Sequence, residues 1–267
     1  MNRNFLLPTV ITAILVVAGC ANKNAIRPGD TADVAFQKAK TLYERGRYLD
    51  AARGFDTVLG ISRGSALAQE SQWMLADSYF KARDYLMASA EYRRYAETFP
   101  RSERRPEAEF QEGLCYVRLS PRYNLDQRDT YRAIESMQLF IARYPSHERT
   151  VDAARIIDQM RDKLARKQFS AGEMYLRIQA FEAAAIYFGL TIDQYPETAW
   201  AERALAKQAQ AYFLFAERSV ATRQAERYRL VVGTYEKYVQ LFPRGENRAE
   251  VEQLVDQARE ALRRIQA

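Results

Sequence analysis

Residues 169–196 read FSAGEMYLRIQAFEAAAIYFGLTIDQYP, and their pattern indicates how the chain folds. Its apolar residues recur at spacings of three and four, which is typical of amphipathic helices. The stretch ends at Tyr195-Pro196. Because proline lacks an amide hydrogen and crowds the preceding turn, this dipeptide marks the end of a helix. The stretch therefore predicts two consecutive helices.

The same ending recurs along the chain. An aromatic residue precedes proline at Phe99-Pro100, Tyr144-Pro145, Tyr195-Pro196 and Phe242-Pro243. These prolines are 45, 51 and 47 positions apart, and an alanine follows each of the first three after eight residues, namely Ala108, Ala153 and Ala204. A recurrence of this kind indicates one structural unit that is repeated and stacked on itself.

The repeated unit fits the tetratricopeptide pattern, a helix pair of 34 residues with small and aromatic residues at fixed positions. The stretch quoted above fits with Ala171, Gly172, Tyr175, Ala184, Phe188 and Pro196. The unit before Pro100 fits at the same offset with Leu75, Ala76, Tyr79, Ala88 and Tyr92. A first unit, which lacks the proline, has Ala39, Leu42, Ala51 and Phe55. We expect Gly172 and Ala76 to let the alanine of the second helix approach closely, and Gly46 or Asp84 to mark the turn of its unit.

The third and fifth units carry insertions between their helices. The third contains Ser120-Pro121-Arg122-Tyr123-Asn124, which predicts a loop. The fifth insertion, around residues 216–229, contains no glycine or proline and predicts longer helices. Residues 148–177 predict one long helix, and residues 247–266 predict an amphipathic helix that caps the stack.

The fold prediction is therefore all-α, an α-solenoid of about five tetratricopeptide helix pairs with a C-terminal capping helix. Units one to three form an N-terminal block over residues 32–147. Units four and five with the capping helix form a C-terminal block over residues 148–267.

The first residues have the features of a secretory signal peptide. Arg3 is the only charge in the first 22 residues, and the apolar run at 5–17 is shorter than the ~20 residues that a membrane span needs. Val17-Ala18-Gly19 directly before Cys20 matches the bacterial lipobox, in which the cysteine becomes the lipidated first residue. The alternative is an ordinary signal peptide with an incidental cysteine.

We expect residues 1–19 to be removed and residues 20–31 to form a flexible, lipidated tether that ends at a helix cap, Thr31. Cys20 is followed by Ala21 rather than aspartate, which favours sorting to the outer membrane.

Composition argues for a binding protein rather than an enzyme. His147 is the only histidine, and the only cysteine besides Cys20 is Cys115, in an apolar helical context. Histidine-based catalysis, metal centres, cofactors and an internal disulfide are therefore not expected. The net charge of +6 is spread over interleaved acidic and basic residues, so nucleic acid is not an expected partner.

A candidate peptide groove follows from the repeat positions on the first helix of each N-terminal unit. At one offset these positions hold Phe36 and Tyr43, then Trp73 and Phe80, then Phe110 and Val117. The same face carries one basic residue per unit, Lys40, Lys81 and Arg118. Aromatic rings suit peptide anchoring, and basic groups suit a terminal carboxylate. The alternative is that neighbouring parts of the stack cover these rings.

The lipobox, the five units, the insertion in unit three and the long helix after it together resemble the BamD family of outer-membrane lipoproteins. The most similar part, residues 130–212, contains AIESMQLFIARYP and DKLARKQFSAGEMYLRIQAFEAAAIYFGLTIDQYP. The resemblance implies a non-enzymatic lipoprotein on the periplasmic face of the outer membrane. It implies that the C-terminal half binds the periplasmic domains of the BamA barrel, and that other Bam lipoproteins are further partners. It also implies binding of unfolded outer-membrane proteins through C-terminal segments with aromatic residues.

A second hypothesis is another tetratricopeptide lipoprotein of the outer membrane, either a pilus-secretin pilotin or an adaptor for cell-wall hydrolases. Pilotin-type chains tend to have regular repeats, whereas this chain has two insertions. The proteins that co-purify with the chain distinguish the two hypotheses.

Overall fold

The computed structural model describes residues 26–266, so the predicted signal peptide, Cys20 and most of the predicted tether lie outside the described residues. The described part forms eleven helices and no strand. The helices are α1 (Ala32–Glu44), α2 (Tyr48–Ile61), α3 (Ala66–Lys81), α4 (Tyr85–Thr98), α5 (Arg105–Leu119), α6 (Arg128–Arg143), α7 (Thr150–Arg177), α8 (Phe181–Gln194), α9 (Ala199–Glu217), α10 (Ala221–Leu241) and α11 (Arg248–Gln266).

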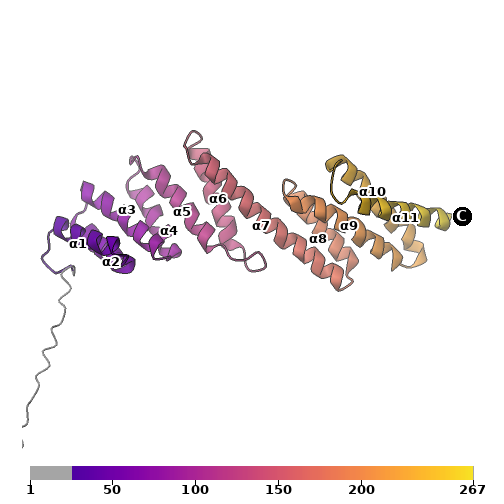
Figure 1. The fold of residues 1–267 in the computed structure, drawn as a ribbon, viewed down its shortest axis with the longest axis horizontal. Helices are drawn as coiled ribbons and strands as arrows, with labels where there is room; N and C mark the ends of the chain where they lie inside the picture. Colours follow the sequence, from indigo (N-terminus) through magenta and orange to yellow (C-terminus); the bar gives the residue numbers. More distant parts are fainter. Residues whose placement is uncertain (1–25, 267) are drawn as a thin grey trace, which may run out of the picture.

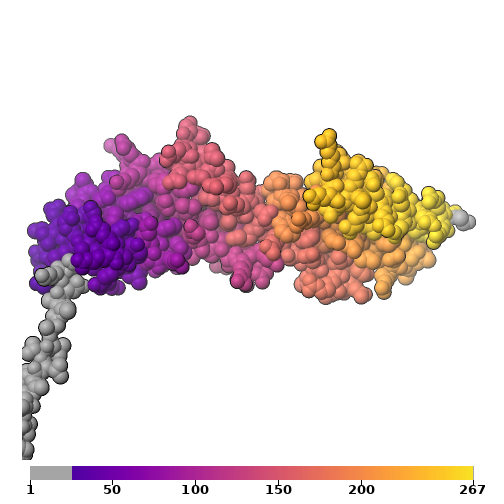
Figure 2. All heavy atoms as spheres, viewed as in Figure 1, coloured from indigo at the N-terminus to yellow at the C-terminus, as the bar shows by residue number. Residues whose placement is uncertain are grey.

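The helices stack in chain order along one elongated row, with α1 at one end and α11 at the other (Figure 1). Each helix packs mainly against the helix before it and the helix after it. The space-filling view shows the same long shape, with the colours of the chain following one another from indigo to yellow along its length (Figure 2). The prediction of an all-α tetratricopeptide solenoid with a C-terminal capping helix is confirmed.

The aromatic residue of each aromatic–proline dipeptide is the C-cap of the second helix in its pair. Phe99, Tyr144, Tyr195 and Phe242 hold this position in α4, α6, α8 and α10. Each of their amides donates to the carbonyl four residues earlier and closes the last turn. The proline that follows cannot donate in the same way, so the helix ends there.

The helix lengths follow the sequence predictions. The long helix predicted at 148–177 is α7, with 28 residues. The insertion in unit three is a loop between Leu119 and Arg128, and the insertion in unit five lengthens α9 and α10 to 19 and 21 residues. Thr31 caps α1, because its hydroxyl accepts from the Val34 amide.

Gly172 lies where α7 and α8 cross, as predicted, but the residue that approaches it most closely is Phe188 rather than Ala184. A Cβ atom at Gly172 would lie 2.7 Å from two carbons of the fully buried Phe188 ring. The absence of a side chain at residue 172 is therefore what allows the two helices to approach.

The tight turns use one residue with positive φ each. This residue is Gly46 in the first unit, with φ 73°, and Arg83 and Gln179 in the second and fourth units, with φ 63° and 62°. Asp84 instead caps α4, where its carboxylate accepts from the Met87 amide at 3.2 Å.

The core is continuous across the predicted boundary at residue 148. The buried cluster around α5 and α6 includes Ile156, Met160 and Leu164 of α7, and it extends to Tyr195 after α8. Trp200 of α9 packs against this cluster and also against the core of the C-terminal units. The α7 helix therefore belongs to the packing of both predicted blocks.

Candidate functional site

The two predicted groove aromatics on α1 are half-buried and contact the helices behind them. Phe36 packs edge-to-face on Phe55, with ring centroids 5.5 Å apart. The Tyr43 hydroxyl donates to the Asp77 carboxylate of α3. Burial and this carboxylate both raise the pKa of Tyr43, so its phenol stays a hydrogen-bond donor at neutral pH.

The two aromatics on α3 are also half-buried. Trp73 packs edge-to-face against Tyr92 and Tyr95, each with centroids 5.5 Å away, and Arg104 lies 5.6 Å above its ring. Phe80 packs on Tyr85 at 5.4 Å. Each ring therefore packs against neighbouring side chains on one side and is accessible to a ligand on the remaining part of its surface.

The assignment of Phe110 to a groove surface is wrong. Phe110 is only 3% exposed and belongs to the core, with its ring 5.4 Å from that of Phe140. The guanidinium of Arg149, just before α7, lies 5.4 Å from the same ring. Arg149 lies over Phe110 as Arg104 lies over Trp73, but Phe110 is buried whereas Phe36 and Trp73 stay partly exposed.

The predicted basic residues Lys40, Lys81 and Arg118 are all exposed. Among the described residues none of the three forms an ion pair. Their charges are therefore available to a ligand, and a role in peptide binding stays a prediction.

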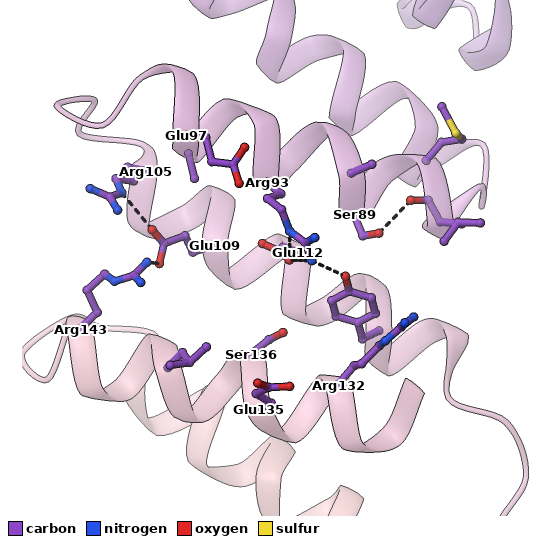
Figure 3. Close-up of a pocket in the computed structure, with 16 residues that line it drawn as sticks. Ser89, Arg93, Glu97, Arg105, Glu109, Glu112, Arg132, Glu135, Ser136 and Arg143 are labelled. Atoms are coloured by element: carbon purple, nitrogen blue, oxygen red, sulfur yellow. Dashed lines mark hydrogen bonds and ion pairs between the residues drawn. The ribbon is translucent and has the colours of Figure 1, made fainter. Parts of the chain in front are cut away.

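A large cavity lies elsewhere, on a face that the sequence analysis did not identify. It is a groove of about 780 Å³, with walls from α4 and α6 and its floor from α5 (Figure 3). We call it the α4–α6 groove. At about 100° per residue, its floor residues Arg105, Glu109, Glu112 and Tyr116 lie on the side of α5 opposite to Phe110 and Arg118.

One signal in the sequence pointed to this groove. Leu86 lies on the side of α4 opposite to the core residues Ala88, Tyr92 and Tyr95, where a solvated helix normally carries a polar residue. Met87 and Leu139 are likewise exposed and apolar. The repeat pattern concerns only the packing residues, so it does not identify such positions.

The groove floor carries two ion-pair networks. In the first, the Arg93 guanidinium reaches one oxygen of Glu112 at 2.6 Å and donates to the Tyr116 hydroxyl at 2.7 Å. In the second, Glu109 accepts from Arg105 at 2.9 Å, from Tyr144 at 3.0 Å and from Arg143. Burial raises the pKa of Glu112, and Arg93 only partly offsets this effect.

The loop inserted into unit three is fixed by a buried glutamine. The Gln127 side chain is 4% exposed, and its amide nitrogen donates to the carbonyls of Arg122 and Leu125 at 2.8 and 3.0 Å. Its oxygen accepts from the Thr130 hydroxyl at 2.7 Å. The Gln127 side chain thus links the inserted loop to the start of α6 through three hydrogen bonds.

The same loop also contacts three basic side chains of α7. Lys163 donates to the Ser120 hydroxyl at 2.7 Å, and Lys167 donates to the Leu125 carbonyl at 2.6 Å. The Arg166 guanidinium lies 4.2 Å above the Tyr123 ring. Successive turns of the long helix therefore support the insertion.

The described residues form no metal-binding cluster. They contain no group of three or more His, Cys, Asp and Glu side chains placed to bind a metal. Cys115 is fully buried, and burial raises the pKa of its thiol to about 12, so it remains a protonated core residue. Over residues 26–266, no helix combines the length and the apolar character needed to span a bilayer.

Comparison with solved structures gives tetratricopeptide proteins. The P58(IPK) TPR domain aligns with 87% of this chain and with 66% of its own length, at 14% identity and a TM-score of 0.41. The TPR2AB domain of yeast Sti1 aligns with 85% of this chain, and with 98% of its own length, at 14% identity and a TM-score of 0.39. Both TM-scores are below 0.5.

Curated relatives carry one name over most of the chain. "Outer membrane protein assembly factor BamD" of Rickettsia prowazekii is 26% identical over 87% of this chain and 92% of its own length. The protein of the same name from Caulobacter vibrioides is 26% identical over 76% and 68%, and that from Vibrio cholerae is 23% identical over 76% and 88%.

The family described as "YfiO: Outer membrane lipoprotein" matches residues 28–229, which extend from before α1 into α10. This match covers most of the chain, and the resemblance to BamD proteins is confirmed. The chain therefore belongs to the YfiO, or BamD, family of outer-membrane lipoproteins.

Proposed function

We propose that this protein is a lipid-anchored component of the outer-membrane β-barrel assembly machinery. The observation that carries the proposal is the family match, which covers nine of the described helices in full and part of a tenth. The curated relatives named as outer membrane protein assembly factors support the same role. In this proposal Cys20 carries the lipid and holds the solenoid at the periplasmic face of the outer membrane.

The two halves of the solenoid have different partners in this proposal. Residues 148–267 bind the periplasmic domains of BamA, with other Bam lipoproteins as further partners. Residues 32–147 bind unfolded outer-membrane protein segments that end in an aromatic residue. Nucleic acid and small-molecule cofactors have no part, and the protein acts by binding rather than by catalysis.

The partly exposed rings of Phe36, Tyr43, Trp73 and Phe80 support the substrate role. Aromatic side chains provide a large contact area and lose little rotamer freedom when they bind. The unpaired charges of Lys40, Lys81 and Arg118 suit a peptide carboxylate. Since Phe110 is buried, the proposed peptide contact uses the rings of units one and two.

The test is affinity purification of the tagged, full-length protein from detergent-solubilised outer membranes, followed by mass spectrometry. We expect a large β-barrel protein with periplasmic domains in near-stoichiometric amount. A secretin in its place would identify the protein as a pilotin, and cell-wall hydrolases would identify it as a hydrolase adaptor. Either result contradicts the assembly role.

A further inference from the structure

The α4–α6 groove is distinct from the aromatic surface discussed above. Its floor residues lie on the opposite side of α5 from Phe110 and Arg118, and none of the predicted peptide-contact residues lines it (Figure 3). It therefore offers the N-terminal half of the solenoid a second place to bind.

The walls of the groove expose apolar side chains that a solvated surface does not need. Leu86 is 62% exposed and Met87 is 40% exposed on α4, and Leu139 is 54% exposed on α6. All three line the groove. Apolar groups on two facing walls, above a polar floor, resemble the apolar core and polar surroundings of a protein interface.

The arginines of the groove are already engaged. Arg93 binds Glu112 and Tyr116, and Arg105 and Arg143 share Glu109. Arg132 contacts Asp129 at 3.3 Å and lies 5.9 Å from the centroid of the Tyr116 ring. No arginine in the groove is left without an internal acceptor.

Two carboxylates are left over. Glu97 on α4 and Glu135 on α6 are exposed, and neither forms an ion pair within the described part of the chain. They lie on opposite walls, so each wall presents one carboxylate that no arginine of the groove neutralises by a direct ion pair. The lining holds four arginines and four glutamates and is neutral as a whole, so these two exposed carboxylates are its points of contact for a cation.

From these contacts we propose that the α4–α6 groove is a docking site for a basic amphipathic segment of a partner protein. The apolar side chains of this segment contact Leu86, Met87 and Leu139, and its lysine or arginine residues pair with Glu97 and Glu135. A helix laid between α4 and α6 is the form that such a groove receives most readily, because two helical walls can hold its apolar face.

The probe is a labelled 14-residue peptide of leucine and lysine at helical spacing, with a peptide of leucine and glutamate at the same spacing as its counterpart. Fluorescence anisotropy with the full chain measures both affinities. We expect the lysine peptide to bind and the glutamate peptide not to bind. The positive net charge of the chain opposes non-specific attraction of the lysine peptide, so its binding reports a local site.

Matched variants locate the contact. Glu97→Gln with Glu135→Gln should weaken binding of the lysine peptide by about tenfold or more, as should Leu139→Ser. These side chains are exposed and make no ion pair, so both variants should fold. Two control variants make equivalent changes at exposed positions of α9 and α10, namely Glu217→Gln with Glu236→Gln, and Leu241→Ser. They should have little effect on the affinity for the lysine peptide.

Hydrogen exchange with bound lysine peptide gives an independent readout. We expect added protection in residues 86–97 and 132–143. Unchanged affinity in the Glu97/Glu135 double variant, equal losses in the control variants, or protection confined to the C-terminal helices would each overturn the proposal. None of these outcomes depends on the assembly role, because the probe is a synthetic peptide and no co-purified partner is involved.

Discussion

The ammonium of Lys163 donates a hydrogen bond to the hydroxyl of Ser120 at 2.7 Å, and this contact joins the middle of α7 to the end of α5. The two residues are 43 positions apart, and the loop inserted into unit three lies between them. Burial lowers the pKa of Lys163, as expected for an ammonium that has lost part of its water. The insertion is thus a structural element that holds α7 in place.

Gln127→Ala should destabilise the protein, because Gln127 is the buried centre of this loop. Without its amide, the carbonyls of Arg122 and Leu125 each lose one donor, and the Thr130 hydroxyl loses its acceptor. The expected loss is ~1–3 kcal/mol in the free energy of unfolding, measured by urea denaturation followed by circular dichroism. Gln138→Ala, at an exposed position of α6, should change it by less than ~0.5 kcal/mol. Equal midpoints for the two variants would show that the loop does not depend on Gln127.

Two glycine-to-alanine variants should change stability in opposite directions. Gly172→Ala places a Cβ 2.7 Å from the buried Phe188 ring and should cost ~1–3 kcal/mol through overpacking. Gly233→Ala, inside α10, meets nothing within 4 Å and should stabilise the helix by ~0.5–1 kcal/mol. Melting temperatures measured by calorimetry give both signs, and a stabilising Gly172→Ala would contradict the close contact.

The repeat architecture could be predicted because it depends on local chemistry. Proline after an aromatic residue ends a helix wherever it occurs, and Gly172 and Ala76 occupy fixed packing positions. The insertion at 120–124 contains proline and asparagine, whereas 216–229 contains no helix breaker, and the structure follows both differences. These signals need no knowledge of distant contacts.

The binding surfaces were harder to predict because exposure depends on neighbours. Phe110 occupies the same repeat position as Phe36 and Trp73, but it belongs to the buried cluster that α6 and α7 form with α5. The α4–α6 groove is formed by three helices whose outward residues follow no repeat. The residue pattern within one unit does not tell which of its side chains a neighbouring helix covers.

The acid stability of the protein should depend on Glu202. Burial alone would raise its pKa, but hydrogen bonds from the Tyr238 hydroxyl at 2.7 Å and from Asn247 at 3.0 and 3.1 Å outweigh burial and lower it. A carboxyl with a lowered pKa stabilises the folded state above its unfolded value of 4.5, and this stabilisation is lost as pH falls through the folded value.

Glu202→Gln should therefore cost ~1–3 kcal/mol at pH 7, and the difference from wild type should shrink as pH falls from about 5 towards 3. Urea denaturation at a series of pH values measures it. Glu226→Gln, at an exposed residue of α10, is the control and should show no such trend. A Glu202→Gln difference that stays constant over this range would contradict the assigned hydrogen bonds.

The proposed anchor predicts a change of location for Cys20→Ser. Without the acyl chains the protein should leave the outer-membrane fraction, because no described helix is able to span the membrane and stable anchoring needs more than one chain. Cys115→Ala removes the other cysteine, which is buried, and should stay in that fraction. Sucrose-gradient fractionation with immunoblotting compares them. A Cys20→Ser protein that remains with the outer membrane would refute the lipid anchor.

The proposed peptide contact on the N-terminal units predicts a selective loss in Phe80→Ala with Lys81→Gln. Phe80 is half-buried and Lys81 is exposed without an ion pair, so the change removes an aromatic contact and a free charge at one place. Affinity for a fluorescent peptide that ends in phenylalanine should fall by about tenfold or more, as expected when an anchor side chain is lost. Leu241→Ala with Lys237→Gln removes an exposed apolar side chain and a lysine that pairs with Asp193 on the C-terminal units, and it should leave the affinity unchanged.

Two further measurements separate the parts of this hypothesis. If Lys81 pairs with the terminal carboxylate, amidation of the peptide should weaken binding to wild type but have little added effect on the Phe80/Lys81 variant. The partner recovered from outer membranes should stay bound, because a repeat contacts mainly its neighbours and α3 is far along the chain from residues 148–267. Unchanged peptide affinity in a variant with a native circular dichroism spectrum would remove the aromatic surface as the substrate site. Loss of the membrane partner together with the peptide would show instead that the two halves of the solenoid do not bind separately.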